Sequence, residues 1–312
     1  MNPLVILGAV AFDLLVGEPP ATWHPVVWMG HLIGAFERRQ PADPKAKQSW
    51  GLKLVVTGLV LSFGLTWGVL HLLGQVSPVA KLIGAILLLK PTFAVGQLGR
   101  QAMLVKRALD RGEIGVARGE AQMLVSRRTA ELTPRQVMGA TIESVAENTL
   151  DSIVAPLFWY FFLGVPGAMA YRFVNTADAM IGYHGQYEYL GKPAARLDDT
   201  LNWIPARLTA LLLVAGSWLA GLRATRAWEL AQRDHALTES PNAGWTMAAA
   251  AGALSVPLDK SGHYHLGDDS PRNLIPRKIS DAVVLMSATS ALAVLLIVLL
   301  QAVTPLGRLP WV

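Results

Sequence analysis

Three carboxylates recur at helical spacing in the segment ESVAENTLD. Glu143, Glu147 and Asp151 stand four residues apart, so a regular helix would place all three on one face. Like charges at this spacing repel, and a positive group must therefore lie beside them, either Arg side chains or a divalent cation. Mg²⁺ is favoured over zinc because carboxylates are hard oxygen ligands. The alternative is a solvated helix face on a cytoplasmic loop.

Two further groups combine Arg with Asp and Asn. The first comprises Arg172, Asn175 and Asp178, and the second comprises Arg196, Asp198, Asp199, Asn202 and Arg207. Within each group the Asp and Asn residues are three or four positions apart, so a helix brings them to one face. Carboxylates that hold a metal, together with Arg that neutralises phosphate oxygens, are typical of a Mg–phosphate site. Because Asp and Asn also cap helices, neither group is specific alone.

Polar residues also gather near the start of the chain and around residue 240. The first set is Asp13, Glu18 and His24, and the second is Arg233, His235 and Asn242. Each His is a candidate base or substrate contact, although a lone His more often only satisfies a hydrogen bond. The segment SPNAG predicts a turn before a small-residue helix, which either binds an anion through backbone N–H groups or simply caps the helix.

Several well-known nucleotide and hydrolase motifs are absent from the sequence. It contains no G-x-x-x-x-G-K-[ST] loop, dinucleotide fingerprint, serine-hydrolase elbow or H-E-x-x-H. Any use of a nucleotide must therefore depend on another type of site.

The composition predicts the environment in which these residues act. Of the 312 residues, 52% are hydrophobic and 16% are charged, and the mean hydropathy is +0.37. An ordinary globular domain carries roughly a quarter charged residues, so the chain is predicted to be an integral membrane protein. The complete lack of Cys excludes disulfides, thiolate nucleophiles and Cys-ligated metals.

Long apolar segments predict the membrane-spanning helices. Four are long enough to span: 52–73, 79–98, 204–222 and 283–303. Two others are ambiguous, because 3–16 is short and 152–170 is interrupted by Pro and Gly, which predicts a kinked span or a re-entrant hairpin. The segment 243–256 is too short to span and predicts a buried or interfacial helix. We therefore expect an all-α fold, a polytopic integral membrane helical bundle with amphipathic cytoplasmic helices and re-entrant or short segments.

The distribution of Lys and Arg predicts the orientation of the early helices. These residues gather in 38–47 and 98–140, which places both segments in the cytoplasm. The spans 52–73 and 79–98 then form a hairpin, whereas the number of later crossings stays open. We expect one membrane-embedded domain over residues 1–312, with a cytoplasmic helical insertion at about 98–150. The net charge of +5 suits contact with anionic lipid, and basic stripes with aromatics for nucleic acid are absent.

Five motifs between residues 17 and 245 carry a family resemblance. They are, in order, GEPPATWHPVVWMG, ESVAENTLDSIVAP, NTADAMIGY, RLDDTLNWIPAR and RDHALTESPNAGW. The sequence resembles the adenosylcobinamide-phosphate synthase (CobD/CbiB) family of cobalamin biosynthesis, and five separate motifs make the resemblance specific. The stretch after Ala253, which includes Asp259, His263 and His265, matches the family pattern poorly.

The resemblance implies an activity. It implies a ligase of the bacterial inner membrane that joins adenosylcobyric acid to (R)-1-amino-2-propanol O-phosphate through an amide, with ATP as co-substrate and with Mg²⁺. The corrinoid is then a substrate rather than a cofactor, the site faces the cytoplasm, and other late enzymes of the pathway are candidate partners. Such a reaction needs carboxylates for metal, Arg for phosphate and a base for the ammonium proton.

The candidate residues are assigned to roles on that basis. The catalytic candidates are His24, Glu143, Glu147, Asp151 and His235. The metal-binding candidates are Glu147, Asp178, Asp198 and Asp199. The substrate-binding candidates are Glu18, Arg172, Asn175, Arg196, Asn202, Arg207, Arg233 and Asn242.

Two other functions are compatible with the residues alone. A Mg-dependent membrane transferase acting on a diphosphate would also use Asp and Asn clusters, but normally carries denser Asp repeats. A transporter would bury charges within its spans and often show related halves, and this sequence shows no repeated halves. The synthase is favoured over both because of the resemblance.

Overall fold

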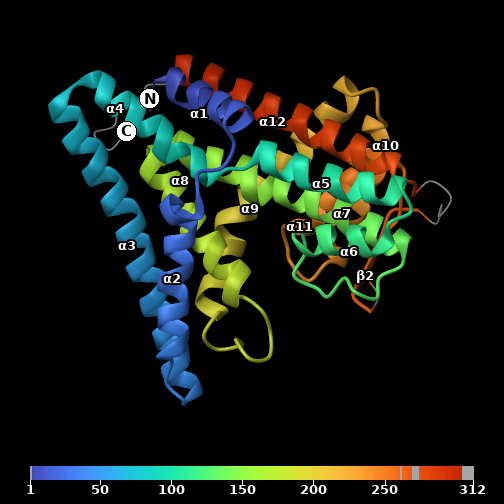
Figure 1. Cartoon of the computed structure of the whole chain (residues 1–312), viewed down its shortest axis with the longest axis horizontal. Helices are drawn as coiled ribbons and strands as arrows, with labels where there is room; N and C mark the ends of the chain where they lie inside the picture. The colour runs from blue at the N-terminus through green and yellow to red at the C-terminus, as the bar shows by residue number, and fades with distance from the viewer. Residues whose placement is uncertain (1, 261, 269–273, 304–312) are drawn as a thin grey trace. The chain divides into compact units, whose positions relative to one another are not determined.

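A computed structural model describes residues 2–260, 262–268 and 274–303 of the chain (Figure 1). Its helices are α1 (Pro3–Leu15), α2 (Pro25–Arg38), α3 (Pro44–Val76), α4 (Pro78–Leu89), α5 (Val95–Asp110), α6 (Ile114–Gln122), α7 (Pro134–Thr149), α8 (Ala155–Ile181), α9 (Lys192–Leu219), α10 (Ala224–Asp234), α11 (Ala243–Leu254) and α12 (Arg277–Val303). The strands β1 (Leu258–Lys260) and β2 (Tyr264–Leu266) form an antiparallel hairpin.

Several helices begin with the same local chemistry. A side chain accepts a backbone N–H bond and a proline follows it at Asn2-Pro3, His24-Pro25, Asp43-Pro44, Ser77-Pro78 and Thr133-Pro134. The capping side chain satisfies an N–H that has no partner within the helix, and proline has no N–H to satisfy. The starts of α1, α2, α3, α4 and α7 are therefore set by adjacent residues.

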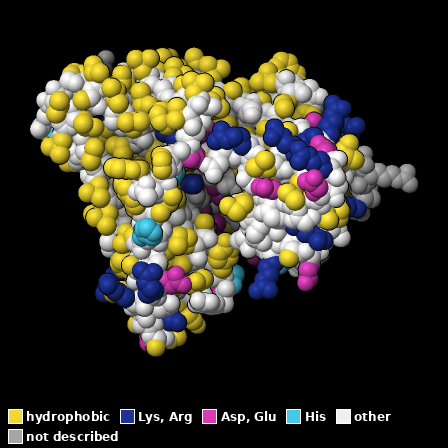
Figure 2. All heavy atoms as spheres, in the orientation of Figure 1, with side chains coloured by type: hydrophobic (Ala, Val, Ile, Leu, Met, Phe, Trp, Pro, Cys, Tyr) yellow, Lys and Arg dark blue, Asp and Glu magenta, His cyan; other side chains and the backbone are white. Residues whose placement is uncertain are grey.

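The described residues include four helical runs long and apolar enough to cross a membrane. They are Pro44–Val76, Pro78–Asp110, Pro134–Ile181 and Arg277–Val303. They contain the predicted spans 52–73, 79–98 and 283–303, and the predicted all-α membrane fold is confirmed. Figure 2 shows hydrophobic side chains over much of the visible surface of α3 and α4.

Three of the apolar segments found in the sequence are not among these four runs, and one of them, 3–16, forms the short apolar helix α1. The predicted span 204–222 lies mainly in α9. The physical reason is that α9 begins with charged residues, Lys192, Arg196, Asp198 and Asp199, so its apolar part is short. The third segment forms α11, which is buried along its whole length apart from Trp245, as expected for a helix too short to span.

The contacts divide the chain into two compact units. Unit 1 comprises residues 1–94, 155–202 and 294–312, and unit 2 comprises 95–154 and 203–293. The insertion predicted at about 98–150 falls in the first segment of unit 2. The second segment of unit 2 contains α10, α11 and the hairpin. The chain thus leaves unit 1 and returns to it twice.

The core of unit 1 is built from α2, α3, α8 and the start of α9. Ile33, Leu54 and Phe173 are completely buried in it. Gly58 of α3 faces the Phe173 ring so closely that a Cβ atom there would lie 1.8 Å from a ring carbon. The glycine therefore allows α3 and α8 to pack at short range.

The helix α8 is interrupted at Gly164, within the segment where we predicted a kinked or re-entrant element. Gly164 has φ 66° and ψ −163°, a backbone conformation essentially restricted to glycine. Pro166 follows two residues later and removes a backbone donor. These two residues explain why an apolar run of 48 residues, Pro134–Ile181, is not one straight helix.

Unit 2 is organised around α11, a helix rich in Ala and Gly. It packs on α10 and on α7, and β1 packs on α7. A Cβ at Gly252 would lie 2.3 Å from the Arg226 carbonyl oxygen, so the small residues let the backbones of α10 and α11 approach closely. The helices α5 and α6 of this unit also pack on α7.

We predict that Gly58→Ala lowers the unfolding temperature of the detergent-solubilised protein, because the added methyl group overlaps Phe173. Overpacking of this kind costs about 1–3 kcal/mol. Gly64→Ala on the same helix is the matched control, since a Cβ added at Gly64 would have no neighbouring atom within 4 Å. The control should be neutral or slightly stabilising, because Ala is a better helix former. Equal effects of both substitutions would contradict the close α3–α8 contact.

Candidate functional site

In unit 1, the amino-terminal residues form a buried charge network with a lysine from the end of α4. The Nζ of Lys90 lies 2.9 Å from Oδ1 of Asp13 and 2.5 Å from Oε1 of Glu18. The side chains of Lys90 and Asp13 are only 2% and 1% exposed. Burial acts to raise the pKa of Glu18, but hydrogen bonds and charge from His24 and Lys90 outweigh it and lower that pKa. Glu18 is therefore ionised at neutral pH.

His24 is fixed by bonds at both ring nitrogens. Its Nδ1 accepts the Val26 N–H at the start of α2, at 3.2 Å. Its Nε2 lies 3.1 Å from Oε2 of Glu18 and must carry the ring proton, which it donates to that carboxylate. Neither nitrogen has a free lone pair in this arrangement, so a role as proton acceptor would require loss of the helix cap.

A second network in unit 1 joins the two Arg–Asp–Asn groups predicted from the sequence. Asn202 donates from Nδ2 to Asp198 at 2.9 Å, and Asn175 of α8 lies 3.5 Å from the other oxygen of that carboxylate. The Tyr171 hydroxyl donates to Asn202 at 2.9 Å, and Arg172 donates to Asn175 at 3.2 Å. The structure thus brings residues from α8 and α9 into one connected group.

Asp198 is the electrostatic centre of this second network. Burial, and after it the charge of Asp178, raises the pKa of Asp198 to about 7. Burial also raises the pKa of Asp199. Arg196, predicted to bind substrate, lies on the same helix and is exposed. No group of three or more His, Asp or Glu side chains within the described residues could hold a metal. Mg²⁺ commonly uses one or two carboxylates with water and substrate phosphates, and Asp178 with Asp198 suits that mode.

In unit 2, two of the three carboxylates predicted on one helical face, Glu143 and Glu147, lie in the regular helix α7. Glu143 is buried, and its Oε2 accepts a bond of 2.6 Å from Arg127. Glu147 is partly exposed, and the charges of Lys260 and Arg127 act on it. Asp151, however, lies in a π-helical turn, Leu150–Val154. A π turn does not keep the 3.6-residue period, so the assumption of one regular face ends before Asp151.

Arg207 of α9 belongs to a stack of rings in the same unit. Its guanidinium lies 4.5 Å from the Trp203 ring centre and 5.3 Å from that of Trp245. Its Nη1 donates to the Trp203 carbonyl at 2.7 Å and to Oδ1 of Asn242 at 3.1 Å. His235 stacks on Trp245 with ring centres 3.9 Å apart. Residues predicted separately as substrate-binding and catalytic therefore lie around one indole ring.

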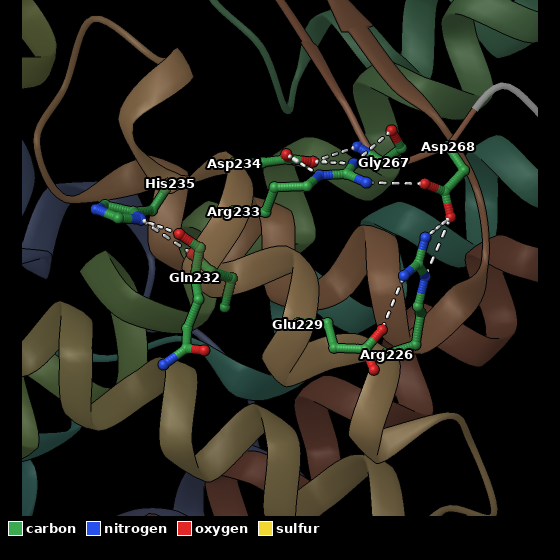
Figure 3. Close-up of polar contacts among 9 residues, drawn as sticks. Arg226, Glu229, Gln232, Arg233, Asp234, His235, Gly267 and Asp268 are labelled. Carbon is green, nitrogen blue, oxygen red and sulfur yellow. Dashed lines mark hydrogen bonds and ion pairs between the residues drawn. The ribbon is translucent and has the colours of Figure 1, made fainter.

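His235 differs from His24 in which ring nitrogen carries the proton. Its Nδ1 lies 3.1 Å from the carbonyl oxygens of Ala231 and Gln232 (Figure 3). Carbonyls only accept hydrogen bonds, so Nδ1 carries the proton and the neutral ring has its lone pair on Nε2. Of the two predicted proton acceptors, His235 is the one whose geometry leaves an acceptor.

Arg233, predicted as a phosphate clamp, is engaged by the protein itself. Its Nε and Nη2 bind the two oxygens of Asp234 at 2.6 and 2.8 Å, and its Nη1 binds Asp268 at 3.0 Å (Figure 3). Arg226 binds Asp268 as well, and these hydrogen bonds lower the pKa of Asp268. The network ties α10 to the end of the hairpin, because Asp234 also accepts the Gly267 N–H.

Comparison with known proteins identifies the family. The family described as "CobD/Cbib protein" matches residues 6–301. The chain belongs to the CobD/CbiB family. It is 45% identical to "Cobalamin biosynthesis protein CobD" of Dehalococcoides mccartyi (strain CBDB1), over 94% of this chain and 95% of the relative. It is 36% identical to "Cobalamin biosynthesis protein CbiB" of Salmonella typhi, over 93% of this chain and 94% of the relative, and no solved structure matches it.

Within this CobD/CbiB protein, sequence reasoning missed residues that the structure places beside the predicted ones. Lys90 lies in a predicted span, where a charged residue generally indicates a functional or pairing role, and that signal was present in the sequence. Trp245 belongs to the SPNAGW motif but was not assigned a contact. Lys260 and Tyr264 lie in the stretch that resembled the family poorly, so nothing in the sequence pointed to them.

We predict that Lys90→Met strongly destabilises this CobD/CbiB protein. The substitution leaves Asp13 and Glu18 close together without their shared cation, and breaking a buried pair costs about 3–5 kcal/mol. Thermal unfolding in detergent measures the effect. Lys106→Met is the control, because the Lys106 and Asp110 side chains are 20% and 45% exposed, far more than Lys90 and Asp13, and a pair open to solvent is worth roughly 0–1 kcal/mol. An unfolding temperature equal to that of the wild type would refute a buried ion network around Lys90.

Proposed function

We propose that the protein catalyses the ATP- and Mg²⁺-dependent ligation of adenosylcobyric acid with (R)-1-amino-2-propanol O-phosphate to give adenosylcobinamide phosphate. The observation that carries the proposal is membership of the CobD/CbiB family over residues 6–301, with relatives named as cobalamin biosynthesis proteins. The described site residues supply the types of group that the reaction needs.

The reaction has two steps, activation of a carboxylate and formation of the amide. A propionate oxygen of the corrinoid attacks the γ-phosphorus of ATP, which gives an acyl phosphate and releases ADP. The neutral amine nitrogen then attacks the acyl carbon, phosphate leaves, and the amide forms with loss of a proton from nitrogen. The protein must therefore hold phosphate groups and accept a proton.

Arg207 is suited to holding a phosphate group. Its Nη1 is fixed by Trp203 and Asn242, and its plane is held near two indole rings. No hydrogen bond engages its Nε or Nη2 among the described residues. A guanidinium fixed in this way presents two remaining donors in the forked geometry that phosphate oxygens prefer.

His235 is suited to accepting the proton. Its Nδ1–H is directed to backbone carbonyls, which fixes the tautomer and leaves Nε2 as acceptor. It stacks on the same Trp245 ring that Arg207 approaches. The base and the phosphate-binding group are thus held by a common indole.

Asp178 and Asp198 are the residues that would hold Mg²⁺, with Asp199 beside them. Their oxygens are the hard ligands that this ion prefers, and Asn175 and Asn202 fix the Asp198 carboxylate. Bound Mg²⁺ supplies neutralisation of phosphate charge. The positive-inside distribution of Lys and Arg supports a site that faces the cytoplasm of a bacterial inner membrane, where other late enzymes of the pathway could supply the substrates.

The proposal is tested by incubating the detergent-purified protein with adenosylcobyric acid, aminopropanol phosphate and Mg-ATP. We expect mass spectrometry to detect the amide product and a coupled assay to detect ADP in equal amount. Omission of ATP should abolish the product. A folded protein that forms no product, even with cytosolic extract added, would overturn the proposal and favour a diphosphate transferase or a transporter.

We predict different consequences for the two histidines. His235→Gln should reduce kcat about 10²–10⁴-fold, the usual range for loss of a general base, with little change in unfolding temperature. His24→Gln should mainly lower the unfolding temperature, because it removes the α2 cap and the Glu18 bond. Steady-state kinetics and thermal unfolding of both variants separate the two roles, and a His235→Gln enzyme with normal kcat would remove His235 from the mechanism.

A further inference from the structure

The Trp245 ring in unit 2 contacts two side chains of complementary chemistry. The His235 ring stacks on it with ring centres 3.9 Å apart and an angle of 25° between the planes. The Arg207 guanidinium carbon lies 5.3 Å from the centre of the same indole. Since both distances are measured to one ring, the guanidinium and the imidazole lie no farther apart than these two distances combined. One small molecule can therefore contact both groups.

The segment SPNAGW holds these groups in place. A Cβ atom at Gly244 would overlap the His235 carbonyl oxygen, so the glycine lets the start of α11 approach His235 closely. The Ser240 hydroxyl accepts the backbone N–H of Asn242 at 3.3 Å. The Asn242 side chain in turn accepts a bond of 3.1 Å from Arg207. A turn predicted only to precede a helix therefore contributes to positioning both the imidazole and the guanidinium.

The two groups have different hydrogen-bonding capacity left for a ligand. Arg207 uses Nη1 on neutral acceptors and makes no ion pair with a carboxylate of the described residues, so its charge and two donors remain for an anion. His235 retains its Nε2 lone pair, which accepts a hydrogen bond from an N–H or O–H. Both side chains are partly exposed, so a ligand can reach them from solution. The pair therefore suits a molecule that carries both an anion and a proton donor.

Of the substrates in the proposed reaction, only the phosphorylated amine combines these two features. Four bonds separate its nitrogen from its phosphorus, and a hydrogen bond at each end adds about 3 Å, so the molecule is long enough to reach both groups. ATP carries phosphates but no nitrogen that must lose a proton in the reaction. The corrinoid acid reacts as a carboxylate, which accepts hydrogen bonds rather than donating them.

We propose that Arg207, His235 and Trp245 form the subsite for the phosphorylated amine. Arg207 binds its phosphate monoester, and Nε2 of His235 takes a proton from its ammonium nitrogen. The ammonium N–H bond breaks as the Nε2–H bond forms, which leaves a neutral nitrogen able to attack the acyl carbon. Trp245 is the positioning residue that sets the distance between the two groups. The identity of the substrate rests on the proposed function, whereas joint recognition of an amine and a phosphate is testable without turnover.

The first experiment needs no catalytic activity. The detergent-purified protein is titrated calorimetrically with (R)-1-amino-2-propanol O-phosphate, and separately with 1-amino-2-propanol and with inorganic phosphate, all without ATP or corrinoid. We expect the phosphorylated amine to bind at least about tenfold more tightly than either fragment, because each end adds a charge-assisted hydrogen bond. Failure of the phosphorylated amine to bind, or equal affinity for inorganic phosphate, would overturn the proposal.

Arg207→Gln should weaken binding of the phosphorylated amine at least about tenfold, because glutamine has neither the charge nor the forked donors. Arg223→Gln is the matched control, since it removes an exposed arginine of the same unit, and should bind as the wild type does. Equal affinities of the two variants would contradict a phosphate contact at Arg207.

The second experiment determines by steady-state kinetics which phosphate Arg207 binds. In Arg207→Gln the KM for the phosphorylated amine should rise at least about tenfold, while the KM for ATP changes less than about twofold. A larger rise in the KM for ATP would place Arg207 on the nucleotide and overturn the proposal. If the wild type forms no amide product, the proposed function fails, while the calorimetric comparison still decides whether the subsite recognises an amine and a phosphate together.

The positioning role of Trp245 is tested by removing and then restoring an aromatic ring. Trp245→Leu should lower kcat/KM for the phosphorylated amine about 10- to 100-fold, because the base and the phosphate-binding group lose their shared contact. Trp245→Phe should restore most of this value, since a phenyl ring still stacks on the imidazole. Trp228→Leu removes an exposed indole of α10 and should be neutral. Unchanged kcat/KM in Trp245→Leu, or no rescue by Trp245→Phe, would overturn the role of the indole.

Discussion

The pairing of buried charges is the constraint on which this structure depends. Lys90 binds Asp13 and Glu18 inside unit 1, and neither Lys90 nor Asp13 contacts much solvent. An ion out of water is costly by several kcal/mol unless an opposite charge lies beside it. The end of α4, the start of the chain and the GEPP segment must therefore meet, which fixes where α1, α2 and α4 lie in unit 1.

The same constraint determines which arginines remain available to bind a ligand. Arg233 and Arg226 bind carboxylates, and Arg127 binds Glu143, so their charges are used to connect elements of unit 2. Arg207 instead binds a carbonyl and an amide, which are neutral. Its positive charge is not cancelled by those partners, and it remains able to bind an anion. Residue type alone cannot make this distinction, because it depends on which partner the fold brings near.

What the sequence predicts here follows from short-range physics. Apolar runs predicted the helices at 52–73, 79–98 and 283–303, and helix starts follow from a capping residue and proline. The four-residue spacing predicts a regular helical face that includes Asp151, but the π turn alters the period just where α7 ends. Strand β1, in the hairpin that holds Lys260 and Tyr264, packs on α7 from more than a hundred residues away in the chain, and no local pattern encodes such a contact.

The comparison of His24 and His235 shows how local backbone chemistry assigns a role to a residue type. Both rings make a bond through Nδ1, but the partner is an N–H donor for His24 and carbonyl acceptors for His235. The first arrangement uses the Nδ1 lone pair and places the proton on Nε2, where Glu18 accepts it. The second places the proton on Nδ1 and leaves Nε2 basic. A helix start therefore gives a structural histidine, whereas the end of α10 gives one able to accept a proton.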